Sequence, residues 1–504
     1  MPKLTLHYPD GRTETHRVES GTRLWDAVEP AYRTAPCGGN GRCGKCRVQA
    51  TGCLSEPQEQ EKSLLGDDLL RDWRLACLTR VTGDAEVTLH QTAQLREICA
   101  DGELPPFVRQ PLFTRYGAAV DIGTTTLAAQ LYDHDGRRLA QAVAANPQAM
   151  FGADVISRIE KSLAGEREAL MRCIRRGIDG LLAELSASAG VSPSDIDAVV
   201  VTGNTTMLYL LTGRSVDCLA RAPFAADELF GRWAQAGEVE LASVPSARVY
   251  LPRCMSAFVG ADITTALLCS GLCERPDSAL LADIGTNGEL ALWHGGRLRC
   301  CSTAAGPVFE GAGISCGMQG VAGAVSHVLW ENGAVRCRTI GGGEPRGICG
   351  SGIIDAAAVF CGQGIIDETG AFTGGRTDYA LATGVTVTQK DIRMLQLGKS
   401  AVCAGIRTLL EAAGLTPEAL TELSVAGGFG TYLNIRNAAA IGLYPAELEG
   451  KTRVLGNAAL AGAAMLLLAE PYVQKSCALA QQAETVDLST SAVFMAHYVD
   501  CMEF

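Results

Sequence analysis

Three cysteines near the start of the chain are close enough in sequence to bind one metal centre. Cys37, Cys43 and Cys46 stand in the segment PCGGNGRCGKC, which also contains four glycines. Glycine lets the backbone take positive φ angles and approach inorganic sulfide, where N–H groups stabilise the negative charge of an iron–sulfur cluster. Cys77, in the apolar segment RLACLTRV, is the candidate for a fourth thiolate. The pattern therefore predicts a [2Fe-2S] cluster held by these four cysteines.

A structural zinc site is the alternative use of the same thiolates. Zinc sites usually pair one Cys-x2-Cys motif with another, and the density of glycines would then have no explanation. The spacing Cys37-x5-Cys43-x2-Cys46 is one residue longer than the plant-type ferredoxin pattern, as in other ferredoxins of that fold. Cys53 is the nearest spare thiol and a weaker candidate for a ligand.

The elements that must position these thiolates begin with a hairpin. Residues 3–8 alternate in polarity like a strand, a Pro-Asp-Gly turn follows, and residues 13–18 form the return strand. Thr22 is expected to cap a helix over LWDAVEPAY, and Cys77 is expected to lie on an apolar strand. This order of elements is typical of a β-grasp fold and predicts a ferredoxin-like domain over residues 1–92.

A second group of chemistry-bearing residues occurs twice. VDIGTTT (120–126) and ADIGTNGE (282–289) each follow an apolar strand. The hydroxyl and N–H groups of such turns can cradle phosphate oxygens, and an aspartate at the strand end can hold Mg²⁺ through water. The repeat predicts two lobes that share a cleft for Mg-ATP. The predicted catalytic residues are Asp121, Asp283 and Glu289, the last as general base or water positioner, and the predicted phosphate-binding residues are Gly123, Thr124, Thr125, Thr126, Gly285, Thr286, Asn287 and Gly288.

Two further glycine-rich turns extend this interpretation. In LSVAGGFGTYLN, Gly427 and Gly428 are small enough for adenine and ribose to lie against the backbone. GICGSGIIDA (347–356) opens a helix whose N-terminus could face an anion. No Walker A sequence occurs, so the protein is not a P-loop ATPase.

Composition excludes some functions and sets the organisation of the chain. The net charge of −12 and the lack of any dense Lys/Arg run argue against nucleic acid as a partner. The apolar run 458–469 is too short to cross a membrane and predicts a buried helix. With no signal peptide at the start of the sequence, the twenty cysteines indicate a reducing, cytoplasmic location. Most of them, such as Cys403, are interpreted as small buried apolar residues.

The predicted parts after the first domain are a linker (93–115), one ATPase lobe (116–277) and a second with the C-terminal helices (278–504).

Two Asp-x-Gly-Thr loops followed by a Gly-Gly loop resemble the ATPase superfamily of actin, sugar kinases and Hsp70. More narrowly, the chain resembles the reductive activators of corrinoid proteins. The stretches that carry this resemblance include PCGGNGRCGKC, NPQAMFGADVISRI, VVVTGNTTM, AAGPVFEGAGISCGM and AGGFGTYLNIRNAAAIGLYP. The resemblance implies an α/β protein in which a β-grasp [2Fe-2S] domain is joined to a two-lobed, ribonuclease H-like ATPase.

The resemblance also implies a function. Such activators use ATP and one electron from the cluster to reduce the inactive Co(II) of a corrinoid protein to Co(I), which supports methyl transfer. The partners would be that corrinoid protein and a low-potential electron donor. Ser302 and Ser315 are hypothesised to contact the corrinoid, because they lie among glycines beyond the second phosphate loop. A homodimer stays open, since only the linker fills the place of a domain that helps some relatives to dimerise.

Other functions fit parts of the sequence. An ATP-driven activator of another low-potential metalloenzyme fits the residues equally well, and a small-molecule kinase of the superfamily would leave the cluster domain without a purpose. An electron-transfer subunit of a flavin or nicotinamide enzyme would need a dinucleotide site, and no strand-linked GxGxxG is found. A chaperone-like protein would hydrolyse ATP without using reducing equivalents.

Overall fold

The computed structural model of the 504-residue chain describes residues 1–8, 11–28, 41, 46–89, 102, 104–427 and 433–504. The chain divides into two compact units. One contains residues 1–94 and 145–174, and the other contains residues 95–144 and 175–504. The helix α4 (Arg167–Ala189) belongs partly to each unit.

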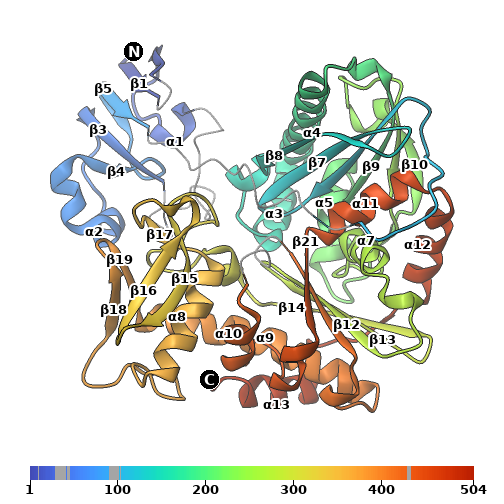
Figure 1. The fold of residues 1–504 in the computed structure, drawn as a ribbon. Helices are drawn as coiled ribbons and strands as arrows, with labels where there is room; N and C mark the ends of the chain where they lie inside the picture. Colours follow the sequence, from blue (N-terminus) through green and yellow to red (C-terminus); the bar gives the residue numbers. More distant parts are fainter. Residues whose placement is uncertain (9–10, 29–40, 42–45, 90–101, 103, 428–432) are drawn as a thin grey trace. The chain divides into compact units, whose positions relative to one another are not determined.

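The first unit contains a five-stranded mixed sheet in the order β2-β1-β5-β3-β4 (Figure 1). β1 pairs antiparallel with β2 and parallel with β5, which confirms the predicted hairpin. Leu4 and Leu6 alternate along β1 and pack with Leu24 in one apolar core, so the strand pattern of the sequence faces that core. The elements are β1 (Lys3–His7), β2 (Thr13–Arg17), α1 (Leu24–Ala27), β3 (Arg47–Leu54), α2 (Glu59–Leu65), β4 (Trp73–Leu75), β5 (Val81–Thr88) and α3 (Val155–Lys161).

The predicted helix cap at Thr22 is wrong. Helix α1 begins at Leu24 without a side-chain cap, and the Thr22 hydroxyl donates to a preceding carbonyl. The backbone N–H of Leu24 donates to the carbonyl of Thr79 at 2.9 Å, and that of Trp25 to the carbonyl of Ala76 at 2.8 Å. Because a neighbouring segment accepts these hydrogen bonds, the first turn needs no hydroxyl cap.

The second unit contains two large sheets with the same central topology. Their orders are β10-β11-β9-β6-β7-β8 and β21-β20-β12-β13-β14-β22. In the first, β6 pairs antiparallel with β7 and parallel with β9. In the second, β12 pairs antiparallel with β13 and parallel with β20, so the sequence duplication is a duplication of structure. The strands are β6 (Tyr116–Ile122), β7 (Thr126–Asp133), β8 (Arg138–Ala145), β9 (Ile196–Gly203), β10 (Arg232–Gln235), β11 (Arg248–Leu251), β12 (Ala279–Ile284), β13 (Gly288–His294), β14 (Arg297–Thr303), β20 (Glu422–Ala426), β21 (Thr452–Gly456) and β22 (Glu484–Thr485).

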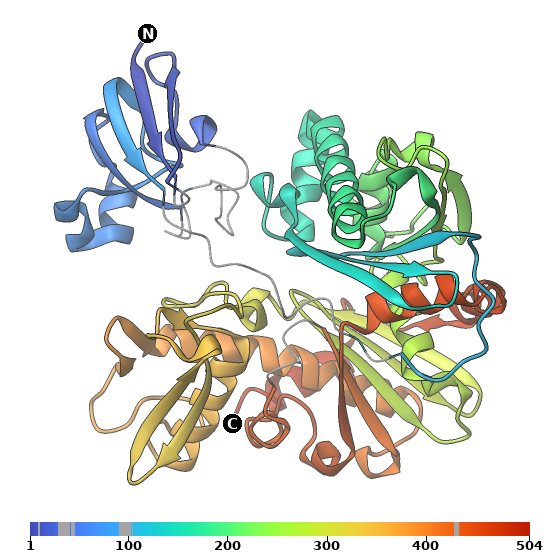
Figure 2. The same cartoon turned by 45° about the horizontal axis from the view of Figure 1, so that its top comes forward.

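Two helices lie between these sheets (Figures 1 and 2). Helix α11 (Ala458–Leu468) packs its apolar residues against β6 and β9, and α7 (Ala261–Ser270) packs against β12 and β13. Every residue of α11 is buried, which confirms the buried helix predicted over 458–469. The two helices touch each other where Gly462 faces the backbone of Thr265. They therefore join the two halves of the unit.

The remaining elements of the second unit pack around the two large sheets. Part of the predicted linker, residues 104–113, packs its apolar side chains onto the cores around α11. The other helices are α5 (Thr205–Thr212), α6 (Asp217–Ala220), α8 (Gly350–Gly362), α9 (Gln389–Ala412), α10 (Ile435–Ala440), α12 (Pro471–Gln482) and α13 (Ala492–Asp500). The smaller sheets consist of β15 (Ala324–Glu331), β16 (Ala334–Thr339) and β17 (Gly347–Ile348), and of β18 (Asp378–Ala382) and β19 (Val385–Thr388).

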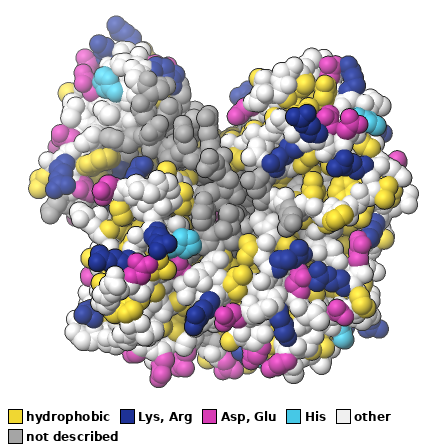
Figure 3. All heavy atoms as spheres, in the orientation of Figure 1, with side chains coloured by type: hydrophobic (Ala, Val, Ile, Leu, Met, Phe, Trp, Pro, Cys, Tyr) yellow, Lys and Arg dark blue, Asp and Glu magenta, His cyan; other side chains and the backbone are white. Residues whose placement is uncertain are grey.

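Two features of the structure concern possible partners, namely the distribution of surface charge and the composition of the helices. Figure 3 shows Lys/Arg and Asp/Glu side chains interspersed over the face that it presents. Within the described ranges, no helix combines the length and the apolar composition that crossing a membrane requires.

The contact between α7 and α11 gives a stability prediction. A Cβ added at Gly462 would stand 1.9 Å from the Thr265 carbonyl oxygen, so the helices must separate to accept it. Gly462→Ala should lower the free energy of unfolding by about 1–3 kcal/mol and the midpoint of thermal unfolding by a few degrees.

Gly180→Ala is the matched control for that experiment. A Cβ at Gly180, in the middle of α4, meets no atom within 4 Å. This substitution should stabilise the protein slightly, because alanine favours a helix by about 1 kcal/mol over glycine. Equal effects of the two substitutions on the melting curve would contradict the proposed close contact.

Candidate functional site

Two of the four predicted cluster ligands are described, and their thiols lie side by side. The sulfur atoms of Cys46 and Cys77 are 3.1 Å apart, and both side chains are buried. Cys46 directly precedes β3, and Cys77 lies in the turn after β4, so the predicted strand position of Cys77 is wrong. The β3–β4 pairing continues through a 2.9 Å hydrogen bond from the Ala76 N–H to the Cys46 carbonyl, which brings the thiols together. Cys37 and Cys43 lie outside the described residues.

The turn that carries Cys77 is fixed by a buried carboxylate that the sequence did not indicate. Glu61 on α2 accepts hydrogen bonds from the Leu75 N–H at 2.7 Å and from the Thr79 hydroxyl at 3.1 Å. Arg74 donates to both of its carboxylate oxygens, at 3.0 and 3.1 Å. A buried charge is tolerable only when it is paired and fully hydrogen-bonded, as here. Two adjacent, buried and rigidly held thiols suit two of the four thiolates that a [2Fe-2S] cluster needs.

A cavity of about 220 Å³ in the second unit is lined by both repeated hairpins. Gly427 also lines it, with a φ of +104° that only glycine adopts freely, and an added Cβ would lie 2.6 Å from the Ile284 carbonyl oxygen. The N-terminal end of α8 lines it through Gly350 and Ser351. The other predicted residues on its wall are Asp121, Gly123, Thr124, Thr125, Thr126, Asp283, Gly285, Thr286, Asn287 and Glu289.

Four predicted residues are not on the cavity wall or cannot be placed there. The Gly288 carbonyl accepts a hydrogen bond from the Thr303 hydroxyl at 3.2 Å, and Ser302 lies on β14 opposite Glu289. Ser315 is exposed on the loop after the 3₁₀ turn 307–310. Gly428 lies outside the described residues.

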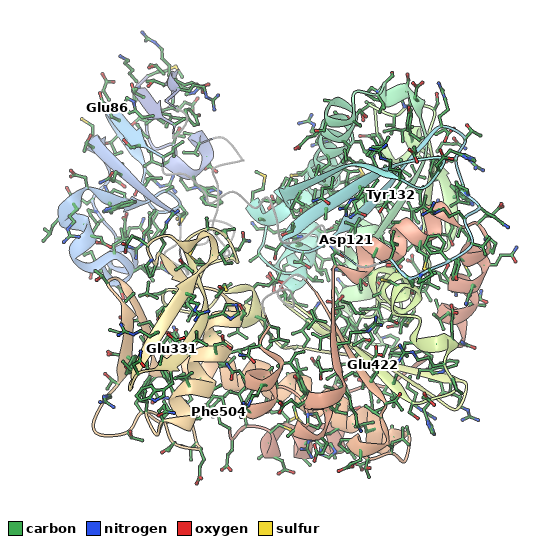
Figure 4. The ribbon with its side chains drawn as sticks, in the orientation of Figure 1. Glu86, Asp121, Tyr132, Glu331, Glu422 and Phe504 are labelled. Carbon is green, nitrogen blue, oxygen red and sulfur yellow. The ribbon has the colours of Figure 1, made fainter. Side chains whose placement is uncertain are left out.

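Strand register places the acidic side chains of the cavity. Asp121 and Asp283 are the second-last residues of β6 and β12, at equivalent positions of the two hairpins (Figure 4 labels Asp121). Across each hairpin, Asp121 faces Ala128, whereas Asp283 faces Glu289. Directly opposed like charges repel each other, and only the second copy has this pair. The two loops are therefore similar in shape and different in chemistry.

The pKa values of these carboxyl groups are all raised. Enclosure in the cavity raises the pKa of Asp121 to about 6. Enclosure, with repulsion from Asp121 and Glu310, raises the pKa of Asp283 to about 7. Asp262 reaches about 8 through enclosure and the charges of Asp283 and Asp121, and the pKa of Glu289 rises well above its usual value for the same kind of reason. At neutral pH, such a cluster becomes fully ionised when positive charge lies among its members.

Sequence reasoning missed several polar residues that line this cavity, namely Asn204, Asp262, Glu310, Gln319 and Asn457. Asp262 stands in the first turn of α7, and Asn457 caps α11 while it donates to Asp121 at 3.0 Å. Asn204 caps α5 and donates to the Thr124 hydroxyl at 3.4 Å. The available signal was the recurrence of a glycine and a polar residue between a strand and a helix, as in TGNTT, LGNAA and VGADI.

Glu310, another of the missed residues, connects the two repeated loops. It accepts hydrogen bonds from the Thr286 N–H at 2.9 Å, from the Thr286 hydroxyl at 2.7 Å and from the hydroxyl of Thr125. An anion therefore already fits between donors that come from both hairpins, which is the property expected of a phosphate site. Among the described side chains, no group of three His, Cys, Asp or Glu residues is arranged to hold a metal ion by itself.

Comparison with known families defines the class of protein. Residues 7–82 match the 2Fe-2S iron-sulfur cluster binding domain, residues 116–275 match the RACo middle region, and residues 277–504 match the C-terminal domain of RACo, the ASKHA domain. The predicted α/β class is confirmed. The chain joins a [2Fe-2S] ferredoxin-like domain to an ATP-binding ASKHA domain.

Individual relatives identify the family. The chain is 34% identical over 416 residues to the corrinoid activation enzyme RamQ of Eubacterium limosum, which covers 76% of this chain and 69% of that protein. It is 25% identical over 430 residues, 76% of each chain, to the [Co(II) methylated amine-specific corrinoid protein] reductase of Methanosarcina barkeri. A solved structure of a reductive activator for corrinoid, iron-sulfur protein matches with a TM-score of 0.73 and 28% identity, over 100% of this chain and 98% of that one. The chain belongs to the family of reductive activators of corrinoid proteins.

The raised pKa values give a pH-dependent stability prediction. Because the pKa of Asp283 is higher in the folded than in the unfolded chain, its ionisation opposes folding. This cost is absent below pH ~4, where both states hold the proton, and is complete above the folded value of about 7. Asp283→Asn should therefore stabilise the protein at pH 8 by on the order of 2 kcal/mol, and by much less at pH 4.5.

Thermal unfolding at several pH values measures this effect. Asp135→Asn, a substitution of an exposed residue in the turn between β7 and β8, is the control and should change the midpoint at neither pH. A stabilisation by Asp283→Asn that does not depend on pH would contradict the proposed repulsion.

Proposed function

We propose that this protein reductively activates a corrinoid protein, in an ATP-dependent reaction that returns inactive Co(II) to Co(I) for methyl transfer. One observation carries this proposal: a single chain contains both the buried thiol pair Cys46/Cys77 and a cavity lined by duplicated Asp-Ile-Gly-Thr hairpins. The names of the relatives that match along the chain support the corrinoid as substrate. They favour this function over activation of another metalloenzyme and over a small-molecule kinase.

The four cysteines Cys37, Cys43, Cys46 and Cys77 are proposed as the cluster ligands. When bound, a [2Fe-2S] cluster supplies a one-electron carrier, with a potential near −400 mV in plant-type ferredoxins. The Glu61–Arg74 pair keeps the Cys77 turn in place, and the strand pairing beside Cys46 aligns the second thiolate with it. These contacts favour a rigid ligand set, which limits the structural change on electron transfer.

The cavity is proposed to bind ATP with Mg²⁺. Hydroxyl and N–H groups of Thr124, Thr125, Thr126, Thr286 and Asn287, with Gly123 and Gly285, would surround the phosphates, and Gly427 and Gly428 would lie against the adenosine. Mg²⁺ usually keeps several waters and binds through one or two carboxylates plus phosphate oxygens. Asp121 and Asp283 suit such water-mediated binding, and Glu289, whose pKa burial and the nearby Asp262 and Asp283 raise well above its usual value, suits the control of the attacking water. Gly288, which does not line the cavity, is proposed only to begin β13 behind the loop.

ATP can change the reaction only through a difference in affinity between two conformations. The cavity residues Asp262 and Asn457 stand at the first turns of α7 and α11, the helices between the sheets. We therefore propose that nucleotide binding and hydrolysis shift the packing of these helices, and that this shift changes the affinity for the Co(II) partner.

The remaining parts of the proposal concern partners and boundaries. Ser302 and Ser315 stay the candidates for contact with the corrinoid, and the Ser315 hydroxyl is held by the Asp391 carboxylate at 3.0 Å. The proposed parts are residues 1–92, 93–115, 116–277 and 278–504. We also propose a low-potential electron donor and a cytoplasmic location. Formation of a homodimer stays an open alternative.

An anaerobic assay tests the function. Reduced protein is mixed with candidate Co(II) corrinoid proteins, with and without Mg-ATP, and Co(I) is followed by its absorbance. We expect ATP-dependent Co(I) formation with one partner. Cys77→Ser should reduce this rate to background and leave basal ATP hydrolysis unchanged, because the thiolate and the cavity belong to separate sites.

Cys53→Ser is the matched control, since Cys53 is an exposed thiol on β3 of the same domain. It should retain both activities. If no partner gave ATP-dependent Co(I), activation of another metalloenzyme would replace this function. Loss of ATP hydrolysis in Cys77→Ser would mean that the two sites are not separable.

A further inference from the structure

Glu310 occupies hydrogen-bond donors that the nucleotide phosphates would need. Its carboxylate accepts hydrogen bonds from the N–H and the hydroxyl of Thr286, at 2.9 and 2.7 Å, and from the hydroxyl of Thr125. A backbone N–H and a threonine hydroxyl each have a single hydrogen to donate. A phosphate that takes these donors therefore displaces the carboxylate, and a carboxylate that keeps them excludes the phosphate.

Charge makes this competition stronger. Burial and the charges of Asp121 and Glu310 raise the pKa of Asp283 to about 7, so the Glu310 carboxylate already lies close enough to repel another anion. A Cβ added at Gly285 would lie 3.3 Å from the Glu310 carboxylate, which places this side chain directly on the second repeated loop. Because a polyphosphate brings further negative charge to the same loop, Glu310 in this position opposes its entry.

The segment that follows Glu310 leaves the cavity and returns to it. Residues 311–318 run to the surface, where Gly313 and Ser315 are exposed. Residues 319–321 then line the same cavity as Glu310. Both ends of the loop 311–318 are therefore joined to residues that meet whatever occupies the cavity, while its middle faces solvent.

Close contacts connect Glu310 with the whole of this loop. The next residue, Gly311, has a φ of +73°, and a Cβ there would lie 2.1 Å from the carbonyl oxygen of Met318, at the other end of the loop. Farther along, the N–H and the hydroxyl of Ser315 donate to the Asp391 carboxylate of α9 at 2.8 and 3.0 Å. The position of Glu310 and the attachment of the loop to α9 are thus parts of one packed arrangement.

We propose that Glu310 is a tethered competitor of the nucleotide phosphates, and that Mg-ATP releases it together with the loop 311–318. In the nucleotide-free protein, the carboxylate joins both hairpins and the loop is held on α9. When the phosphates take the donors of Thr125 and Thr286, Glu310 leaves them and the loop loosens. Occupancy of the cavity is thereby signalled at the surface of the molecule. This inference rests on the nucleotide site proposed above.

Removal of the carboxylate tests the competition by its sign. Glu310→Ala should bind Mg-ATP more tightly than the wild-type protein, by on the order of tenfold, because no carboxylate occupies the donors before the nucleotide arrives. Glu310→Gln, which keeps the size of the side chain and loses its charge, should gain affinity to a smaller extent. Calorimetric titration of the full-length holoprotein measures both constants. Equal or weaker binding by Glu310→Ala would overturn the proposal, since a residue that only supports the site would lose affinity.

Hydrogen exchange separates release of the loop from a mere loss of charge. In the wild-type protein, Mg-ATP should speed exchange in residues 311–318, and nucleotide-free Glu310→Ala should already exchange at the faster rate. Asp262→Asn is the matched control, because Asp262 lines the same cavity but its carboxylate bonds the N–H of Ile263 in its own helix. Exchange of the nucleotide-free loop should be unchanged in this variant.

Failure of this inference and failure of the nucleotide site give different results. A wild-type protein that does not bind Mg-ATP would remove the nucleotide site, and this inference with it. A wild-type protein that binds Mg-ATP while exchange in 311–318 stays the same or slows would overturn the role of Glu310 alone.

Discussion

The structure depends on one electrostatic constraint, the enclosure of several carboxyl groups in a single cavity. Strand register fixes Asp121 and Asp283 at equivalent ends of two hairpins and sets Glu289 directly across from Asp283. Helix α7 adds Asp262 from a third direction. Burial raises the pKa of all these groups, and repulsion between neighbouring carboxylates raises that of Asp262, Asp283 and Glu289 further. A divalent cation carried by phosphates is the ligand that we propose to offset this cost.

The same constraint connects the cavity with the rest of its unit. Asn457, the residue directly before α11, donates a hydrogen bond to Asp121, and Asp262 lies in the first turn of α7. These two helices pack on each other and on both sheets, with Gly462 allowing the close approach. A change of charge in the cavity therefore acts on the helices that join the halves of the unit. Glu310, hydrogen-bonded to both repeated loops, gives a second connection through the 3₁₀ turn 307–310, which packs on α9.

Local sequence patterns predicted the parts that repeat or alternate, and missed what only tertiary contact brings together. The duplicated DIGT segments, the first hairpin and the buried helix α11 could be predicted because their signals are local. Glu310 could not, because its partners Thr125 and Thr286 come from two hairpins far apart in the sequence. Asp262 and Asn457 follow a weak Gly-polar pattern that does not reveal that they face the same cavity. The predicted helix cap at Thr22 and the predicted strand at Cys77 were wrong for a related reason. Carbonyl groups of a neighbouring segment accept the hydrogen bonds of the first turn of α1, and Glu61 holds the turn that carries Cys77. Roles for the site residues stay predictions.

The central claim is that the enclosed carboxyl groups form the site for Mg-ATP, and proton release on binding tests it most directly. Asp262 and Asp283, with pKa values of about 8 and 7, hold protons at pH 7 that a cation would displace. Calorimetric titration of preformed Mg-ATP at pH 7, in two buffers of different ionisation enthalpy, measures these protons. The account predicts net release in the wild-type protein and less in Asp262→Asn. Binding with no change in protonation, or equal release in both proteins, would contradict it.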